Sequence, residues 1–219
     1  MSLYPQAFYD QIEAGASSSA AAVVPVLMDL FSPTTVVDVG CGQGAWLAEF
    51  RHEGCDVQGF DGAHVDRNRL AIPSSCFRPV DLASQRIPAV NVDLAMSLEV
   101  AEHIPESRAK FLVADLCAAA DVVLFSAATP GQGGVGHVNE QWPAYWVDKF
   151  ERQGFRVSGA LRWQFWSRVP EVENWYAQNM LVAVKHPDRY PDLFAGPWCE
   201  PFGVVHPRQW AARVGQVWP

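Results

Sequence analysis

The sequence predicts an α/β fold in which a mainly parallel sheet is covered by helices on both faces. Two observations lead to this prediction. Short β-branched apolar runs alternate with amphipathic helical segments, and a glycine-rich turn joins the first run to the first helix. Such alternation is typical of βαβ units. The length of 219 residues and the hydrophobic fraction of 49% fit one domain with a substantial core.

The elements follow in order along the chain. The helix over 45–53 turns Trp46, Leu47 and Phe50 inward and stops at Gly54. The next two helices each begin at a proline, which suits a first turn. We expect strands at 35–40, 56–62, 91–97, 121–127, 155–159 and 179–185, with helices at 45–53, 105–120 and 143–152.

The two ends of the chain do not share the alternation of strands and helices. Residues 4–31 are expected to be mostly helical, with an interruption near 15–19, where the sequence is GASSS. After residue 186 the chain is rich in proline and glycine, which predicts an irregular tail over 187–219 with one short helix near 207–214. Its tryptophans indicate that the tail packs onto the domain formed by 1–186.

Charge and cysteine content restrict the possible partners. The formal charge of −8 and the lack of a lysine and arginine run argue against nucleic acid. Five scattered cysteines without a C-x-x-C pair predict free thiols in a reducing cytoplasm. No signal peptide is recognised, and no apolar run is judged long enough for a membrane span. The oligomeric state stays open.

The glycine-rich turn contains Gly40, Gly42 and Gly44 at the carboxyl end of the first strand. Ligands of open parallel sheets bind at that edge, and glycine lets the backbone approach them closely. Asp61 ends the second strand, where an acidic side chain can hold ribose hydroxyls. These features predict an adenosine ligand. The spacing G-x-G-x-G places Ala45 where the dinucleotide fingerprint has glycine, which disfavours NAD.

The sequence resembles the class I S-adenosylmethionine-dependent methyltransferases. The resemblance is carried by VVDVGCGQG at 36–44, GFDG at 59–62, VDLAS at 80–84 and DLAMSLEVAEHI at 93–104. It covers about residues 20–160 and implies a Rossmann-like sheet of seven strands with the last strand antiparallel. The strand over 179–185 would then be inserted beside 155–159, and the helical region 1–31 would form a lid.

The resemblance also implies roles for individual residues. Those assigned to the cofactor are Asp38, Gly40, Gly42 and Gly44 at the methionine end, Asp61 at the ribose, Asp81 and Leu82 at the adenine, and Ser97 and Leu98 at the sulfonium. The alternative for Asp81 is a turn or cap aspartate. Tyr4, Phe8 and Tyr9 are read either as an aromatic lid or as core packing.

Two segments should converge above the transferable methyl group. SLEVAEHIPE brings Glu102 and His103, and the glycine-rich stretch 127–142 brings His137. Methyl transfer to an oxygen needs its proton removed, so His137 or His103 is a candidate general base. Trp142, Asn139 and Glu140 are the candidate substrate contacts.

A metal site is the alternative. Glu99, Glu102, His103 and His137 resemble the metal ligands of small-RNA terminal 2′-O-methyltransferases, where Mg²⁺ binds two neighbouring ribose hydroxyls. Such ligands would acidify a diol hydroxyl. The same segment also occurs in methyltransferases without a metal, where it serves packing, capping or cofactor contacts.

The predicted function is S-adenosylmethionine-dependent methylation of a small molecule, with a hydroxyl of a saccharide or natural-product intermediate as the acceptor. N-methylation is the main enzymatic rival, because a neutral amine needs less base assistance. The sequence is also compatible with a non-catalytic module that binds the cofactor, and with a dehydrogenase.

Overall fold

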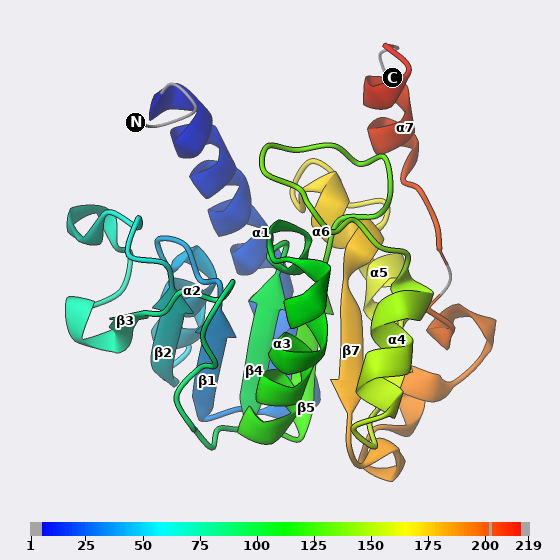
Figure 1. The fold of residues 1–219 in the computed structure, drawn as a ribbon. Coiled ribbons are helices and arrows are strands. Elements are labelled where there is room, and N and C mark those ends of the chain that lie inside the picture. The colour runs from blue at the N-terminus through cyan, green and yellow to red at the C-terminus, as the bar shows by residue number, and fades with distance from the viewer. Residues whose placement is uncertain (1–5, 202, 216–219) are drawn as a thin grey trace.

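The centre of the protein is a seven-stranded sheet (Figure 1) in the order β3-β2-β1-β4-β5-β7-β6. The computed structural model describes residues 6–201 and 203–215, with side chains from residue 13 onward except that of Trp198. The strands are β1 Thr35–Val39, β2 Asp56–Asp61, β3 Phe77–Pro79, β4 Leu94–Leu98, β5 Val122–Ser126, β6 Arg156–Ser158 and β7 Leu181–Val184. β1 to β5 pair in parallel, whereas β7 is antiparallel to β5 and β6. The predicted sheet, with its last strand inserted beside β6, is confirmed.

Helices cover both faces of this sheet. They are α1 Gln6–Phe31, α2 Ala45–His52, α3 Glu106–Ala119, α4 Pro143–Glu151, α5 Ala160–Phe165, α6 Asn174–Asn179 and α7 Pro207–Arg213. One core cluster joins α1, α2, α5 and α6 to one face, and a second joins α3 and α4 to the other. Figure 1 shows α3 and α4 in front of the sheet, with α1 and α2 behind it.

Strand side chains alternate between the two clusters. Leu94, Met96 and Leu98 of β4 pack toward α1 and α2, whereas Ala95 packs toward α3 and α4. This is the period of two that a strand imposes, and burial on both faces explains the nearly continuous apolar runs in the sequence.

The predicted interruption of the N-terminal helix is wrong, because α1 runs without a break from Gln6 to Phe31. The hydroxyls of Ser18 and Ser19 donate to the carbonyl of Gly15 at 3.1 and 2.7 Å, so these side chains bond within the helix instead of ending it. Gly15 also makes room for Glu173, whose carboxylate would collide with a Cβ at that position.

The segment Glu13–Phe31 of α1 is also long and apolar enough, by length and composition alone, to cross a membrane. The expectation that no run approaches this length is therefore wrong. The core helix of a soluble protein passes the same test, and Ala20, Val23, Val24 and Leu27 are buried in the core that α1 shares with α2.

The tail contains α7 and three short 3₁₀ turns, Pro187–Arg189, Pro191–Phe194 and Pro197–Cys199. Leu193, Cys199 and Ala211 are buried. Arg162 of α5 is completely buried and donates through Nη2 to the carbonyl of Glu200 at 3.1 Å, which ties the tail to the helical layer. All five cysteines are free thiols.

Candidate active site

The turn between β1 and α2 is built from glycines in the left-handed region. Gly40, Gly42 and Gly44 have φ of 89°, 53° and 86°. The N–H of Gly40 donates to the carbonyl of Phe60 at 2.7 Å, and a Cβ on Gly40 would lie 2.2 Å from Val100. Nothing lies within 4 Å of a Cβ placed on Gly42, so this part of the turn faces open space.

Asp61 at the end of β2 fixes this turn from the side. Its carboxylate accepts hydrogen bonds from the backbone N–H of Gly42, at 2.7 Å, and of Gly62. The sequence placed Asp61 and the glycine turn at one ligand site, and the fold brings them into direct contact.

Asp38 lies in the middle of β1, between Gly59 of β2 and Met96 of β4. Its side chain is buried, and Oδ1 has no hydrogen-bond partner within the described part of the chain. Burial, assisted by the charge of Asp61, raises the pKa of Asp38 to about 8. A buried acid with a free oxygen beside a glycine cradle fits a ligand that brings a positive charge, as the ammonium group of S-adenosylmethionine does.

Other residues assigned to the cofactor have structural partners in this structure. The hydroxyl of Ser97 is buried and donates to the carbonyl of Val39 at 2.8 Å, so it joins β4 to β1. Asp81 is exposed and accepts from the N–H of Ala83 and the hydroxyl of Ser84 at 3.1 and 2.6 Å. These contacts correspond to the alternative in which Asp81 organises a turn. Leu98 is buried in the core cluster beside α1 and α2.

The two rim segments converge as predicted. The turn Ala101–His103 follows β4, and its Glu102 carbonyl accepts from the N–H of Val138 and Asn139 at 2.8 and 3.0 Å. The imidazole rings of His103 and His137 meet edge to face, with centroids 4.8 Å apart. Burial and the neighbouring His137 lower the pKa of His103, which favours its neutral form.

Glu140 organises the loop that carries His137. Its Oε1 lies 2.8 Å from Nδ1 of His137, and its two oxygens accept from the N–H of Gly131 and Gly133 at 2.8 and 3.0 Å. Partial burial works to raise the pKa of Glu140, but the hydrogen bonds from His137 and the two glycines leave the pKa lowered. A Cβ on Gly134 would lie 2.2 Å from Nε2 of His137, so glycine allows the ring to sit against the loop.

These contacts change two of the predicted substrate assignments. Glu140 is engaged within its own loop, and Asn139 is buried, donating to the carbonyl of Ala101 at 3.4 Å and accepting from Gln141 at 3.0 Å. Of the three predicted substrate contacts, Trp142 is the one with an exposed side chain.

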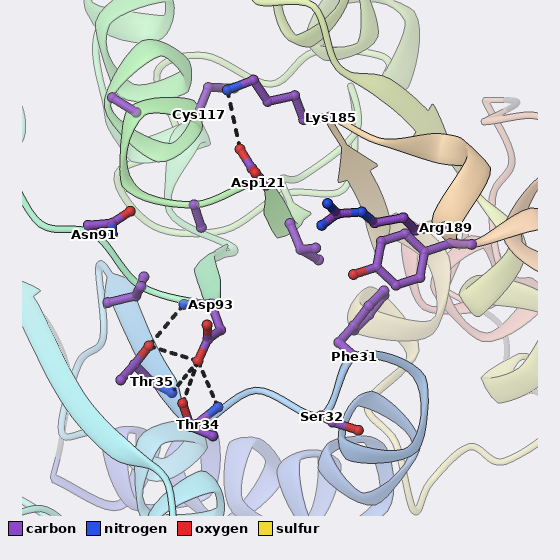
Figure 2. A pocket seen from close by; sticks show the side chains of 15 residues that line it. Phe31, Ser32, Thr34, Thr35, Asn91, Asp93, Cys117, Asp121, Lys185 and Arg189 are labelled. Carbon is purple, nitrogen blue, oxygen red and sulfur yellow. Dashed lines mark hydrogen bonds and ion pairs between the residues drawn. The ribbon is translucent and has the colours of Figure 1, made fainter.

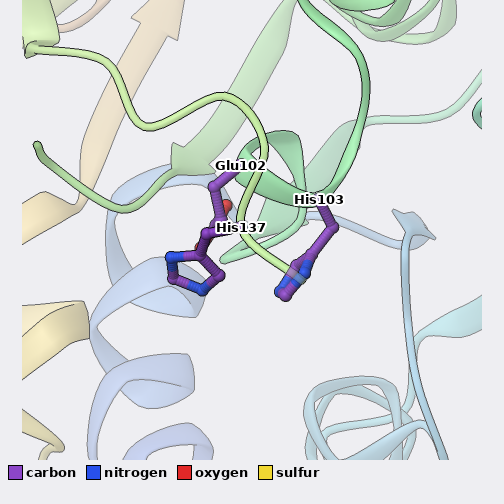
Figure 3. A group of neighbouring side chains, drawn as sticks. All are labelled: Glu102, His103 and His137. Atoms are coloured by element: carbon purple, nitrogen blue, oxygen red, sulfur yellow. The ribbon is translucent and has the colours of Figure 1, made fainter. Parts of the chain in front are cut away.

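The predicted metal ligands are brought together only in part. Glu102, His103 and His137 can place one ligand atom each within 4.8 Å of one another (Figure 3). Oε2 of Glu102 is buried without a hydrogen-bond partner among the described residues, and burial, with the charge of Glu99, raises the pKa of Glu102. Glu99 lies outside this group, because its carboxylate accepts from Gln132 at 2.8 Å and Asn179 at 3.0 Å.

Sequence reasoning missed the amide network that holds Glu99. Asn179 also donates to Oε1 of Gln132 at 2.8 Å, and Gln178 donates to Thr129 at 3.0 Å. Glu99 itself has a φ of 54°, which is uncommon for a residue other than glycine. One signal was present in the sequence. Gln178 and Asn179 directly precede β7, and because β7 is antiparallel to β5, it starts at the edge of the sheet where β5 ends.

A groove of about 800 Å³ lies at the opposite edge of the sheet (Figure 2). Its wall includes Asp93, which accepts from the N–H of Thr34 and Thr35 at 2.8 and 2.9 Å, and Lys185, which pairs with Asp121 at 3.3 Å. The hydrogen bonds from Thr34 lower the pKa of Asp93. These residues surround the amino ends of the strands, whereas ligands of open α/β sheets bind at the carboxyl ends. We therefore place the candidate active site at the glycine turn.

Comparison with solved structures supports the same fold. A magnesium protoporphyrin IX methyltransferase from Synechocystis PCC 6803 with bound S-adenosylmethionine is 19% identical, with a TM-score of 0.59, and the match covers 84% of this chain and 86% of that one. An amino pentose methyltransferase from Micromonospora echinaspora, also with bound S-adenosylmethionine, is 17% identical, with a TM-score of 0.59 and coverage of 84% and 99%. DesVI from Streptomyces venezuelae is 14% identical, with a TM-score of 0.58 and coverage of 84% and 99%.

Among curated proteins, none matches the chain significantly. Residues 14–168 match the family described as "Methyltransferase domain", a span that includes the glycine turn, Asp61 and both rim segments. The chain therefore belongs to the methyltransferase domain family and has the Rossmann-like fold of the class I S-adenosylmethionine-dependent methyltransferases.

Proposed function

We propose that the protein transfers a methyl group from S-adenosylmethionine to a hydroxyl of a small molecule, such as a saccharide or natural-product intermediate, with His137 as the general base. The observation that carries the proposal is the contact of 2.8 Å between Nδ1 of His137 and Glu140. A carboxylate on Nδ1 fixes the tautomer in which Nε2 is free to accept a proton, and it stabilises the imidazolium that forms.

The remaining residues position the reactants. Gly40, Gly42 and Asp38 are proposed to hold the methionine end of the cofactor, and Asp61 its ribose. The cofactor supplies the activated methyl group, so the chain has to align the acceptor and remove its proton. His103, whose pKa is lowered, packs against His137 as a neutral ring and leaves the proton transfer to His137.

The test is the variant His137→Asn, with His52→Asn as the matched control because His52 is an exposed histidine on α2. S-adenosylhomocysteine affinity is measured by calorimetry, and transfer of labelled methyl groups is measured on a panel of phenols, alcohols, saccharides and amines. We expect unchanged affinity and a loss of ~100-fold or more in transfer to the hydroxyl acceptor. Transfer that is insensitive to His137 would refute the base role, and transfer confined to amines would indicate N-methylation.

A divalent metal is the second candidate, and the unpartnered buried Oε2 of Glu102 favours it. Glu102, His103 and His137 would supply one carboxylate and two imidazole ligands, and a bound cation would lower the pKa of a diol hydroxyl. Glu99 is removed from the predicted ligand set, since its oxygens are held by Gln132 and Asn179.

Titration of Mg²⁺ and Mn²⁺ into the protein saturated with S-adenosylhomocysteine separates the two candidates. The metal proposal expects stoichiometric binding that is lost in Glu102→Gln, which keeps the shape of the side chain. Equal metal binding by the wild type and Glu102→Gln would show that this cluster does not hold the ion. In that case Glu102 serves the loop through its backbone carbonyl, which the substitution leaves intact.

A further inference from the structure

Among the side chains that the structure describes, the exposed large hydrophobic residues lie in two segments. They are Val135, Val138, Trp142, Val205, Trp210 and Val214. Three belong to the loop that carries His137, and three belong to the C-terminal tail. Scattered apolar residues need no explanation, but their concentration in two segments does.

The two segments are in contact. The side chain of Gln209 donates to the carbonyl of Gln132 at 2.8 Å, and the N–H of His206 donates to Gln178, which belongs to the amide network under the loop. A Cβ on Gly203 would lie 3.0 Å from the Trp142 ring. Figure 1 shows the loop and α7 at the same end of the molecule. The tail over 187–219 also lies beyond residue 168, where the match to the methyltransferase domain family ends.

Helix α7 gives part of this surface a local positive charge. α7, PRQWAAR, contains Arg208 and Arg213 and no acidic residue, in a chain with a formal charge of −8. Arg213 lies three residues after Trp210, so the two are neighbours on the helix surface, and a Cβ on Gly133 of the loop would lie 3.1 Å from the Arg213 guanidinium. In a two-fold dimer this surface would face its own copy and bring the arginines of both α7 helices together, whereas an apolar anion would find both kinds of contact.

We propose that the loop and the tail together form the acceptor-binding surface, and that the acceptor has an apolar body and an anionic group. Val138, Trp142 and Trp210 contact the body, and Arg213 pairs with the anion. This proposal rests on the proposed function, because it takes the ligand of the surface to be the methyl acceptor. The tail is then the part of the chain that selects the substrate.

Anilinonaphthalene sulfonate, a fluorescent apolar anion, is the probe for this surface. It is titrated into the full chain saturated with S-adenosylhomocysteine, for the wild type and for Val138→Ser, Trp210→Ser and Arg213→Gln. Arg189→Gln is the matched control, because Arg189 is an exposed arginine at the opposite edge of the sheet. We expect the dissociation constant to rise ~5-fold or more in each surface variant and to stay unchanged in the control. All changed side chains are exposed, so circular dichroism and cofactor affinity should stay at wild-type values.

Three results would overturn the proposal. One is unchanged probe affinity in the surface variants. Another is a wild-type dimer in sedimentation that Trp210→Ser converts to a monomer, which would assign the surface to a second copy. The third is co-flotation with vesicles of phosphatidylglycerol that Trp210→Ser abolishes, which would assign it to a membrane. If S-adenosylhomocysteine does not bind but the surface variants still weaken probe binding, the proposed function is refuted while the binding site for apolar anions is supported.

Discussion

Replacing Asp38 by asparagine should change how the stability of the protein depends on pH. Burial raises the pKa of Asp38 in the folded state from 3.8 to about 8, whereas the unfolded chain keeps the ordinary value. The folded state therefore binds the proton more tightly. A raised folded-state pKa gives stability that is fully present below the unfolded pKa and is lost as the pH rises through the folded pKa.

The magnitude follows from the size of this shift. Between pH 5 and 8 the folded state keeps the Asp38 proton while the unfolded state has lost it, so the free energy of unfolding should fall by about 1.4 kcal/mol per pH unit. Over that interval the wild type should lose about 4 kcal/mol relative to Asp38→Asn, which has no proton to lose. Other titrating groups are shared by the two proteins and cancel in the difference.

Urea denaturation of both proteins at half-unit steps from pH 5 to 8 measures this difference. A difference that varies by less than about 1 kcal/mol over the interval would refute the reasoning, because the carboxyl group would then be ionised in the folded state as it is in the unfolded chain. Asp61→Asn gives an independent check. Removing the charge of Asp61 lowers the pKa of Asp38, so the decline should end at a lower pH.

Three further predictions concern the cradle, the loop and the tail. Gly40→Ala should destabilise the protein by about 1–3 kcal/mol more than Gly54→Ala in thermal unfolding, because the two glycines have φ of 89° and 92° but only Gly40 would press its Cβ into Val100. Equal losses of stability in Gly40→Ala and Gly54→Ala would contradict the predicted clash with Val100. Glu140→Gln should lower the stability of the protein at pH 7, and this loss should vanish as the pH falls through the lowered pKa of Glu140. A stability difference that does not change with pH would show that the charge of Glu140 does not stabilise the loop. Arg162→Met should accelerate proteolysis of the tail, because it removes the hydrogen bond to the carbonyl at position 200. An unchanged cleavage rate would show that the tail is held without this hydrogen bond.

The sequence was sufficient for the sheet because its signals are local. The buried strands are short apolar runs, and α4 begins at a recognisable residue, Pro143. β3 has three residues, and α5 and α6 have six each, so none offers enough positions for a period to show. The glycine within α1 at position 15 makes room for Glu173, which is 158 residues away, and no local pattern encodes that contact.

In the candidate site too, some features could be predicted from the sequence and others could not. Parallel strands end at one edge, so topology alone brought Asp61 to Gly42 and His103 to His137. The orientation of each side chain could not be predicted. Glu99 and Glu102 are three residues apart, yet one faces the amides of Gln132 and Asn179 and the other lies beside the histidines. The left-handed backbone at Glu99, with a φ of 54°, accompanies this difference in direction.

The edge of the sheet that carries the glycine turn also carries acids that the fold makes difficult to ionise. Burial raises the pKa of Asp38, Glu99 and Glu102, and each raised pKa is stability lost at neutral pH. A ligand that brings a positive charge reverses this loss, because an ionised acid beside a cation is favoured. S-adenosylmethionine and S-adenosylhomocysteine both carry the ammonium group that we propose faces Asp38, so each should stabilise the protein, and this gain should shrink in Asp38→Asn. The electrostatic cost of burying Asp38 is then offset by the positive charge of the cofactor that we propose binds beside it.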